Sequence, residues 1–240
     1  MMGRLCAITI AAAWAVALAA GCARGPAPRS DAIYQVSTIS ALLEGVYDGE
    51  TTADDLLRRG DLGIGTFNAL EGEMIVLDGK VYQARADGQV FAMPGETNTP
   101  FAVVSFFDVD EEVQLSDIGG MEDLKSALDQ AFGRDNLFLA VRIDGAFDYV
   151  KARSVPRQAK PYPPLAQAVE DQRIFLFEET EGTILGFRCP DFVEGINMPG
   201  WHLHFLSSDR RDGGHLLDCR FAKARAQADI SREFFMRLPD

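Results

Sequence analysis

The chain has 240 residues, of which 47% are hydrophobic and 10% aromatic, enough to bury the core of one large domain or of two intimately packed ones. Its formal net charge of -13 argues against nucleic acid and anionic lipid as partners, because both carry negative charge themselves. Neither an internal repeat nor a glycine-rich phosphate loop is evident, so the alternation of apolar and polar residues is the main guide to the fold.

The N-terminal segment predicts export. Residues 1–21 combine a positive charge at Arg4, an almost wholly apolar run over 5–18 and small residues before Cys22, as bacterial signal peptides do. The apolar run is too short to span a bilayer comfortably. Ala-Ala-Gly before Cys22 resembles the lipobox of bacterial lipoproteins, so we expect a lipid anchor at Cys22 in the cell envelope. Ordinary secretory cleavage, which would leave a soluble secreted protein, is the alternative.

A tether and a folded body follow. Residues 22–30 are rich in proline, arginine and small residues, which suits a flexible tether, and the globular domain is expected over 31–240. Cys189 and Cys219 are the cysteines of that domain. Outside the cytoplasm they could form a disulfide, and two buried thiols are an equally good interpretation.

The first half of the domain is predicted to consist mainly of strands. A strand over 61–67 leads into two β-rich runs within 70–84, joined as a hairpin by the turn Asp78-Gly79, and another strand covers 101–107. Apolar residues at helical spacing, with charges between them, then predict an amphipathic helix over Met121–Phe132.

The second half continues in the same way. A strand over 136–143 runs on toward 144–155, and prolines at 161–164 break the chain before a short helix over 165–172. Strands follow at 174–178, at 183–188 and in a histidine-bearing hairpin, whereas 224–238 shows no clear pattern. The order predicts an α+β fold of two β-rich halves, with mainly antiparallel or mixed sheets and a few helices.

All three histidines fall within fourteen residues of the chain. His202 and His204 share one face of a strand because side chains alternate, and an antiparallel partner strand can bring His215 beside them. His-x-His alone is equally typical of two hydrogen-bonded strand histidines, and the third histidine favours a metal site on this hairpin. Three neutral nitrogen ligands with one open position are typical of catalytic zinc.

Several motifs, in order, resemble the bacterial α-acetolactate decarboxylases. The resemblance covers nearly all of 31–239, and the motifs together make it specific. They are Gly-Ile-Gly-Thr-Phe-Asn over 63–68, Leu-Glu-Gly-Glu over 70–73, Lys-Ala-Arg-Ser-Val over 151–155, Glu-Gly-Ile-Asn-Met-Pro-Gly-Trp-His-Leu-His-Phe over 194–205 and Gly-Gly-His-Leu-Leu-Asp over 213–218.

The resemblance implies a zinc enzyme, usually a homodimer, that converts 2-acetolactate to acetoin and CO2. It implies that His202, His204 and His215 are the zinc ligands. Losing CO2 from a β-keto acid leaves electrons that the neighbouring carbonyl must absorb, and zinc held by neutral histidines would act as the Lewis-acid electron sink for the enediolate. No organic cofactor is then required.

The resemblance also implies three catalytic residues. Glu73 becomes a carboxylate at the metal site that can handle a proton, Arg153 the cation that faces the substrate carboxylate, and Thr66 a hydroxyl lining the pocket. Without the resemblance, each would be taken as an ordinary strand residue. Trp201 and Phe205 are assigned to packing, and Asp209, Asp212 and Asp218 to turns or to support of the ligands.

One departure from the family's pattern keeps alternatives open. Family members continue past the Leu-Pro that resembles Leu238-Pro239, and their tail brings another glutamate toward the active site, to which no residue here can be matched. We therefore expect weakened activity as one outcome. The alternatives are a non-catalytic lipoprotein that binds metal or 2-hydroxy acids, and a different metal reaction, such as hydrolysis or oxygenation, at the same histidines.

Overall fold

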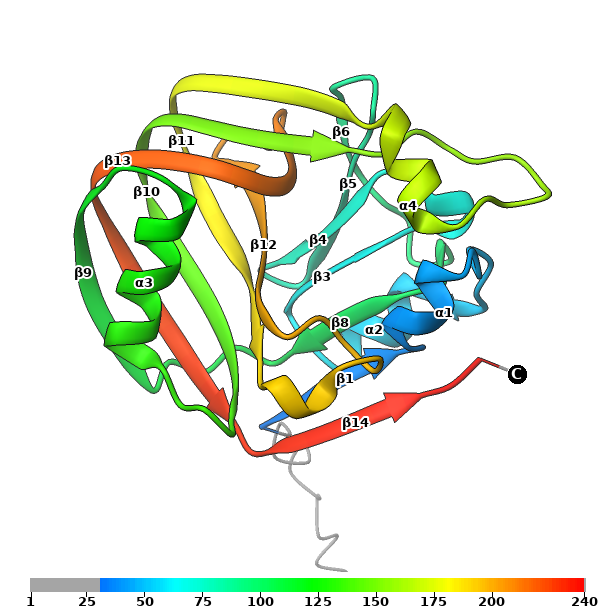
Figure 1. Ribbon diagram of the computed structural model, residues 1–240, viewed down its shortest axis with the longest axis horizontal. Coiled ribbons are helices and arrows are strands. Elements are labelled where there is room, and N and C mark those ends of the chain that lie inside the picture. Colours follow the sequence, from blue (N-terminus) through cyan, green and yellow to red (C-terminus); the bar gives the residue numbers. More distant parts are fainter. Residues whose placement is uncertain (1–30, 240) are drawn as a thin grey trace, which may run out of the picture.

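The computed structural model describes residues 31–239, so the predicted signal segment, the tether and Cys22 lie outside the described residues. Within this range no helix is long and apolar enough to cross a membrane. Two large β-sheets packed against each other form most of the molecule (Figure 1).

The first sheet has seven strands in the order β14-β1-β8-β3-β4-β5-β6. Neighbours are antiparallel except β1 and β14, which are parallel, so the last described strand pairs with the first. The strands are β1 (Ala32–Val36), β3 (Leu62–Thr66), β4 (Glu73–Leu77), β5 (Lys80–Ala84), β6 (Val90–Ala92), β8 (Ala102–Ser105) and β14 (Glu233–Arg237).

The second sheet has five antiparallel strands in the order β10-β11-β12-β13-β9, and β10 also pairs with β13. This additional pairing closes four of the strands into a ring. The strands are β9 (Glu111–Ile118), β10 (Phe138–Ser154), β11 (Arg173–Cys189), β12 (Gly200–Ser207) and β13 (Gly213–Ser231); β2 (Thr51–Thr52) and β7 (Asn98–Thr99) form a separate small pair.

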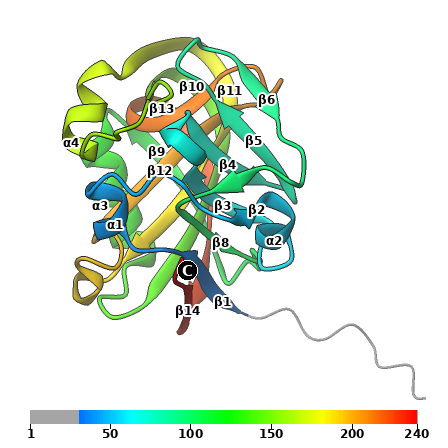
Figure 2. The ribbon, with the colours of Figure 1, turned by 90° about the vertical axis from the view of Figure 1, so that its right-hand side faces the viewer.

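The helices are short except α3 (Met121–Phe132), which packs on β9 and β13 with its apolar face buried. Thr38 caps α1 (Ile39–Leu43), and Thr52 caps α2 (Ala53–Leu57) in a capping box with Asp55. Figure 1 shows α1 and α4 (Leu165–Ala168) on the side of the molecule opposite α3, and Figure 2, which looks onto that side, again shows α1 and α4 close together. Single 3₁₀ turns are η1 (Asn68–Leu70), η2 (Val169–Asp171) and η3 (Asp191–Val193).

One hydrophobic cluster joins the two sheets. It places Ile75 and Leu77 of β4 with Leu185 and Phe187 of β11 and Leu206 of β12, all nearly free of solvent contact. Burying each such side chain contributes roughly 1.5–3 kcal/mol, so this layer fixes how β4 lies against the second sheet.

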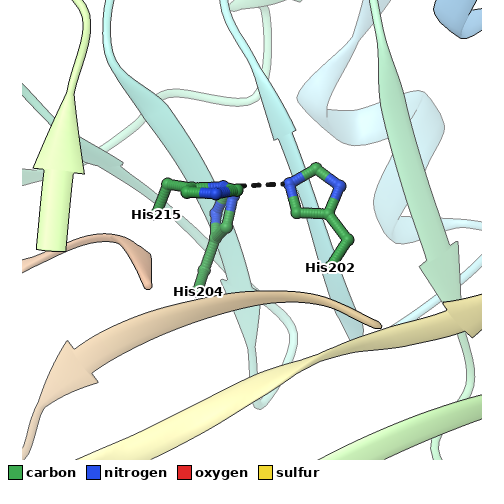
Figure 3. A group of neighbouring side chains, drawn as sticks. All are labelled: His202, His204 and His215. Carbon is green, nitrogen blue, oxygen red and sulfur yellow. Dashed lines mark hydrogen bonds between the residues drawn. The ribbon is translucent and has the colours of Figure 1, made fainter. Parts of the chain in front are cut away.

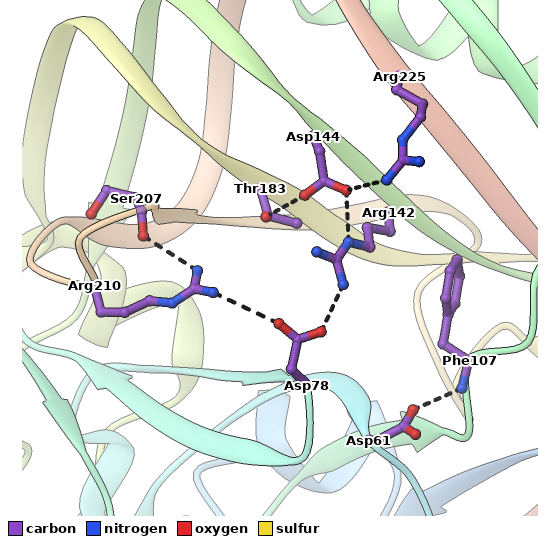
Figure 4. Close-up of polar contacts among 9 residues, drawn as sticks. All are labelled: Asp61, Asp78, Phe107, Arg142, Asp144, Thr183, Ser207, Arg210 and Arg225. Carbon is purple, nitrogen blue, oxygen red and sulfur yellow. Dashed lines mark hydrogen bonds and ion pairs between the residues drawn. The ribbon is translucent and has the colours of Figure 1, made fainter.

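Ion pairs reinforce the same contact at one rim. Asp78, in the β4–β5 turn, accepts from Arg142 of β10 at 2.7 Å and lies 3.8 Å from Arg210 of the β12–β13 turn (Figure 4). Arg142 in turn pairs with Asp144 at 2.7 Å. One acidic turn residue thus ties β4 to the strands of the second sheet.

The structure confirms the α+β class, the hairpin at Asp78-Gly79 and the helix Met121–Phe132. Both turn residues have positive φ, 52° and 70°, as a tight two-residue hairpin turn requires. The two strands expected at 174–178 and 183–188 are one strand, β11, because β10 pairs along its whole length. The helix expected over 165–172 is α4 followed by η2.

The two cysteines of the domain are not paired with each other. Cys189 and Cys219 are both buried free thiols, without a disulfide between them. Burial raises the pKa of each thiol to about 12, so neither is an available nucleophile at neutral pH.

Candidate metal centre

The β12–β13 hairpin brings the three histidines together. His204 lies directly opposite His215 in the ladder, and His202 lies two residues away on the same face (Figure 3). One ring nitrogen from each histidine falls within 4.8 Å of the other two. Among the described residues, this is the group of histidine, cysteine and carboxylate side chains with the geometry to hold a metal ion.

Two glycines permit the close approach of the strands here. A Cβ at Gly186 of β11 would lie 2.0 Å from the carbonyl oxygen of His202, and one at Gly214 of β13 would lie 2.6 Å from that of Arg153. Their φ angles, 156° and 150°, are also ones that other residues rarely adopt. Any larger residue would push the histidine strand or the arginine strand away.

The histidines are held neutral. Burial lowers the pKa of His202 to about 4, and burial lowers the pKa values of His204 and His215 well below the usual value, with Arg153 adding to the effect on all three. Neutral imidazoles keep a lone pair, which a metal ligand requires. Figure 3 also shows His202 Nε2 facing His215 Nδ1, 3.1 Å away.

His204 provides the test of whether a metal fits. Its Nδ1 lies 2.9 Å from the carbonyl oxygen of Met74 on β4, so Nδ1–H donates to that oxygen and Nε2 carries the lone pair. Nε2 is buried and has no hydrogen-bond partner among the residues that the structure describes. A buried nitrogen without a partner is costly, and a metal ion would satisfy it. The donor set therefore fits a divalent ion such as Zn²⁺.

Glu73 lies beside the histidines. It begins β4, is only 9% exposed, and its Oε2 is 3.7 Å from His204 Nε2. Burial raises the pKa of its carboxyl to about 7, and the nearby charge of Arg153 opposes that rise. Thr66 is its neighbour in the β3–β4 ladder, with its hydroxyl donating to the carbonyl oxygen of Gly72 at 2.8 Å.

Arg153 reaches the centre because of an irregularity in its strand. The β10–β13 ladder slips by one residue between Lys151 and Ala152, after which Arg153 lies opposite His215. Lys151, two residues earlier, is exposed. Its guanidinium charge lies close enough to lower the pKa values of the three histidines and to oppose the rise in the pKa of Glu73.

These residues open into one cavity of about 330 Å³, a size suited to a small molecule. One part of its wall is polar and the other is apolar. The polar part consists of Thr66, Glu73, Arg153, His202 and His215, and the apolar part includes Ile39, Leu42, Leu43, Leu70, Phe101, Val155, Leu165, Met198 and Trp201.

The structure therefore gathers all six predicted site residues at one place, His204 lying directly behind the cavity wall. Phe205 is a core residue, as predicted, whereas Trp201 both packs on the core and lines the cavity. Asp209 and Asp212 lie in the β12–β13 turn. Asp218 accepts from Tyr149 and from the backbone of Met121, at the start of α3.

Two features of the site carry no signal in the sequence. The Met74 carbonyl that orients His204 comes from the other sheet, 130 residues away. The apolar wall from α1 likewise depends on a chain path that residue patterns do not reveal. Only the tertiary arrangement brings either of them to the histidines.

Comparisons with known proteins place the chain in a family. The sequence profile of the family described as alpha-acetolactate decarboxylase matches residues 33–240. The alpha-acetolactate decarboxylase of Methanosarcina mazei is 52% identical over 210 residues, covering 88% of this chain and 73% of the relative. That of Methylococcus capsulatus is 44% identical over 208 residues, covering 87% of this chain and 80% of the relative.

Solved structures show the same likeness. The crystal structure of alpha-acetolactate decarboxylase from Bacillus subtilis superposes with a TM-score of 0.84 at 39% identity, covering 87% of this chain and 89% of that one. Fold, sequence profile and curated relatives therefore agree along nearly the whole described chain, and the protein belongs to the alpha-acetolactate decarboxylase family.

Proposed function

We propose that this protein decarboxylates 2-acetolactate to acetoin and CO2 with a zinc ion held by His202, His204 and His215. The observation that carries the proposal is the buried Nε2 of His204, which has no hydrogen-bond partner among the described residues and lies beside two other neutral imidazoles, with Glu73 and Arg153 at the same cavity. The family relatives, which are named for acetolactate decarboxylation, support the choice of substrate.

A Zn²⁺ ion bound there would supply a Lewis acid that draws electrons toward the substrate's carbonyl oxygen. The protein's own part begins with binding. Arg153 is the cation at the cavity, and its planar fork suits two hydrogen bonds to the substrate carboxylate. This contact would orient the bond to be broken, between C1 and C2 of 2-acetolactate.

The reaction consumes one proton. Breaking the C1–C2 bond releases CO2, and its electron pair moves to C2 and the adjacent carbonyl, giving an enediolate. Glu73 lies near enough to the histidines to protonate C2, which yields acetoin, and water then returns a proton to the carboxyl. A carboxyl with a pKa of about 7 can both donate and accept a proton near neutral pH.

The surrounding wall has a simpler role. The apolar side chains of the cavity exclude water from the carboxylate being lost, which strengthens the electrostatic contact with Arg153. Thr66 would contact substrate oxygen through its hydroxyl, which already donates to Gly72 and keeps a lone pair free to accept.

Metal analysis and reconstitution test the choice of metal. Purified protein should contain about one zinc per chain, and chelated protein should regain acetoin formation when zinc is returned. Iron at the histidines together with oxygen-dependent turnover would contradict this proposal and favour a different metal reaction.

Assembly and location are proposed on other grounds. We propose a homodimer, which the open edge of β11 supports: Arg173–Glu181 pairs with β10 on one side only, with Ile174 and Leu176 47% and 58% exposed. Sedimentation of the purified protein tests the homodimer, for which it should give twice the mass of one chain.

We also propose that the protein is exported and lipid-anchored, which the pattern before Cys22 supports. Lipid labelling of cells should mark the wild-type protein and should not mark a Cys22→Ser variant.

A further inference from the structure

Two segments far apart in the sequence contribute the exposed apolar residues of the cavity wall. Helix α1 contributes Ile39, Leu42 and Leu43, and residues 194–199 contribute Met198 and Pro199. We refer to α1 and 194–199 together as the cavity lip. Leu43 and Met198 are 42% and 46% exposed, so the lip presents apolar side chains where a ligand would enter.

Backbone hydrogen bonds join the two halves of the lip. The amide of Ile39 donates to the carbonyl oxygen of Ile196 at 2.9 Å, and the amide of Ser40 donates to that of Gly195 at 3.3 Å. The Ser40 hydroxyl donates to the same Gly195 oxygen at 2.8 Å. These bonds satisfy amides of the first turn of α1, which have no partner within the helix.

A buried pair of amide side chains lies beneath these contacts. Gln35 of β1 has no solvent exposure, and Asn197 is 3% exposed. The Gln35 amide group donates to the carbonyl oxygens of Ser37 at 2.7 Å and Ile196 at 2.8 Å, and its oxygen accepts from Asn197 Nδ2 at 2.6 Å. Asn197 Oδ1 accepts in turn from the amide of Met198 at 2.6 Å.

This network lies where it controls both halves of the lip. Ser37, with a φ of 62°, is the turn that leads from β1 into α1, and Met198 carries the apolar side chain of the other half. Gln35 is therefore bonded at once to the turn that leads into α1 and to the segment 194–199. Replacing either amide would leave buried polar groups without partners and allow the halves to separate.

We propose that Gln35 and Asn197 are a positioning pair that holds the cavity lip in the shape that binds substrate. The inference rests on the proposed function: the lip residues that line the cavity are apolar, so we assign to them the contacts with the two methyl groups of 2-acetolactate. Those groups do not react, so contacts with them are equal in the ground state and the transition state. Loss of the pair should raise KM and leave kcat nearly unchanged.

The metal ligands are held independently of this pair. His202 is fixed by the β11–β12 ladder opposite Phe187, and His204 by the Met74 carbonyl. Zinc affinity should therefore remain at the wild-type value when the pair is broken. An unchanged zinc affinity would distinguish a displaced lip from a general loosening of the metal site.

The experiment compares Gln35→Met, Asn197→Ala and the double variant in the full chain. Each single variant should raise KM for 2-acetolactate about tenfold, the equivalent of one lost hydrogen bond, with kcat within about twofold of wild type. The rise in KM of the double variant should be smaller than the product of the two single rises, because both residues belong to one hydrogen-bond network. Asn197→Ala, in a loop, provides the same test if Gln35→Met does not fold.

Ser231→Ala is the matched control. The Ser231 hydroxyl donates to Asp31 at 2.6 Å at the opposite end of β1, so its loss should lower Tm without changing KM. Zinc affinity, measured by competition with a chromogenic chelator, should be unchanged in all variants. An unchanged KM in both single variants, or an equal rise in Ser231→Ala, would overturn the positioning pair. Absence of acetoin from the wild-type protein would contradict the proposed function itself.

Discussion

Arg153→Ala should abolish most of the activity and leave the metal in place. Arg153 approaches the site through the irregularity in β10 and lies opposite His215, yet it is not a metal ligand. Its removal takes away the positive charge that lines the cavity beside the histidines and Glu73. The substrate carboxylate would then enter a cavity whose wall is largely apolar, without a partner for its charge.

The size of the effect follows from the contact that is lost. A hydrogen bond to a charged group contributes about 1.5–3 kcal/mol, and a guanidinium–carboxylate contact is at the upper end of that range. A loss of about 3 kcal/mol lowers kcat/KM about 150-fold. The fall in kcat/KM is larger if the Arg153 guanidinium makes two independent hydrogen bonds to the carboxylate.

Steady-state acetoin formation and zinc content, measured on the same preparation, test this prediction. Lys151→Ala is the matched control, because Lys151 is an exposed cation of the same strand, two residues away. It should retain wild-type kcat/KM. An Arg153→Ala protein with full activity would show that another group binds the carboxylate, and one that loses zinc would show that Arg153 supports the histidines instead.

Further variants test the remaining parts of the account. His204→Ala should lose zinc and activity together, because it removes the buried nitrogen that has no hydrogen-bond partner among the described residues; elemental analysis and acetoin assays check this. Glu73→Gln should keep zinc while kcat falls about 10²- to 10⁴-fold, the usual effect of losing an acid–base group; unchanged turnover would assign proton transfer elsewhere. Asp229→Asn should change the pH dependence of stability. Burial, with the charges of Asp31 and Asp110, raises the pKa of Asp229 to about 7, so the free energy of unfolding should fall between about pH 4 and pH 7 as the unfolded chain ionises first. The asparagine variant should remove most of that fall, with a higher Tm than wild type at pH 8 and no change at pH 4. Equal changes in Tm at pH 4 and pH 8 would contradict the raised pKa of Asp229.

The sequence predicted the elements whose signals are local. The Asp78-Gly79 turn and the helical spacing over Met121–Phe132 need no distant partner, and both are confirmed. Helices α1 and α2 were missed although Thr38 and Thr52 carry capping signals, because five residues are too few for a periodic pattern.

Elements that depend on distant partners could not be predicted. Strand β11 runs through the polar stretch 178–181, where the alternation of apolar and polar residues predicts a break between two strands. Pairing with β10 on both sides of this stretch makes it one strand. Strand β14 joins the first sheet only because β1, two hundred residues earlier, offers a parallel edge. The histidine cluster was predictable from alternation along one hairpin, whereas Glu73 and Arg153 required the family resemblance, since each comes from a different strand.

Acetoin release from racemic 2-acetolactate is the most direct test of the central claim. The purified full chain should form acetoin well above the spontaneous rate when zinc is present, and a chelator should abolish that formation until zinc is returned. Folded, zinc-loaded protein that leaves 2-acetolactate untouched across pH would contradict the account and support a binding role for the histidine site. Acetoin formation that a chelator does not affect would contradict the zinc ion's part in it.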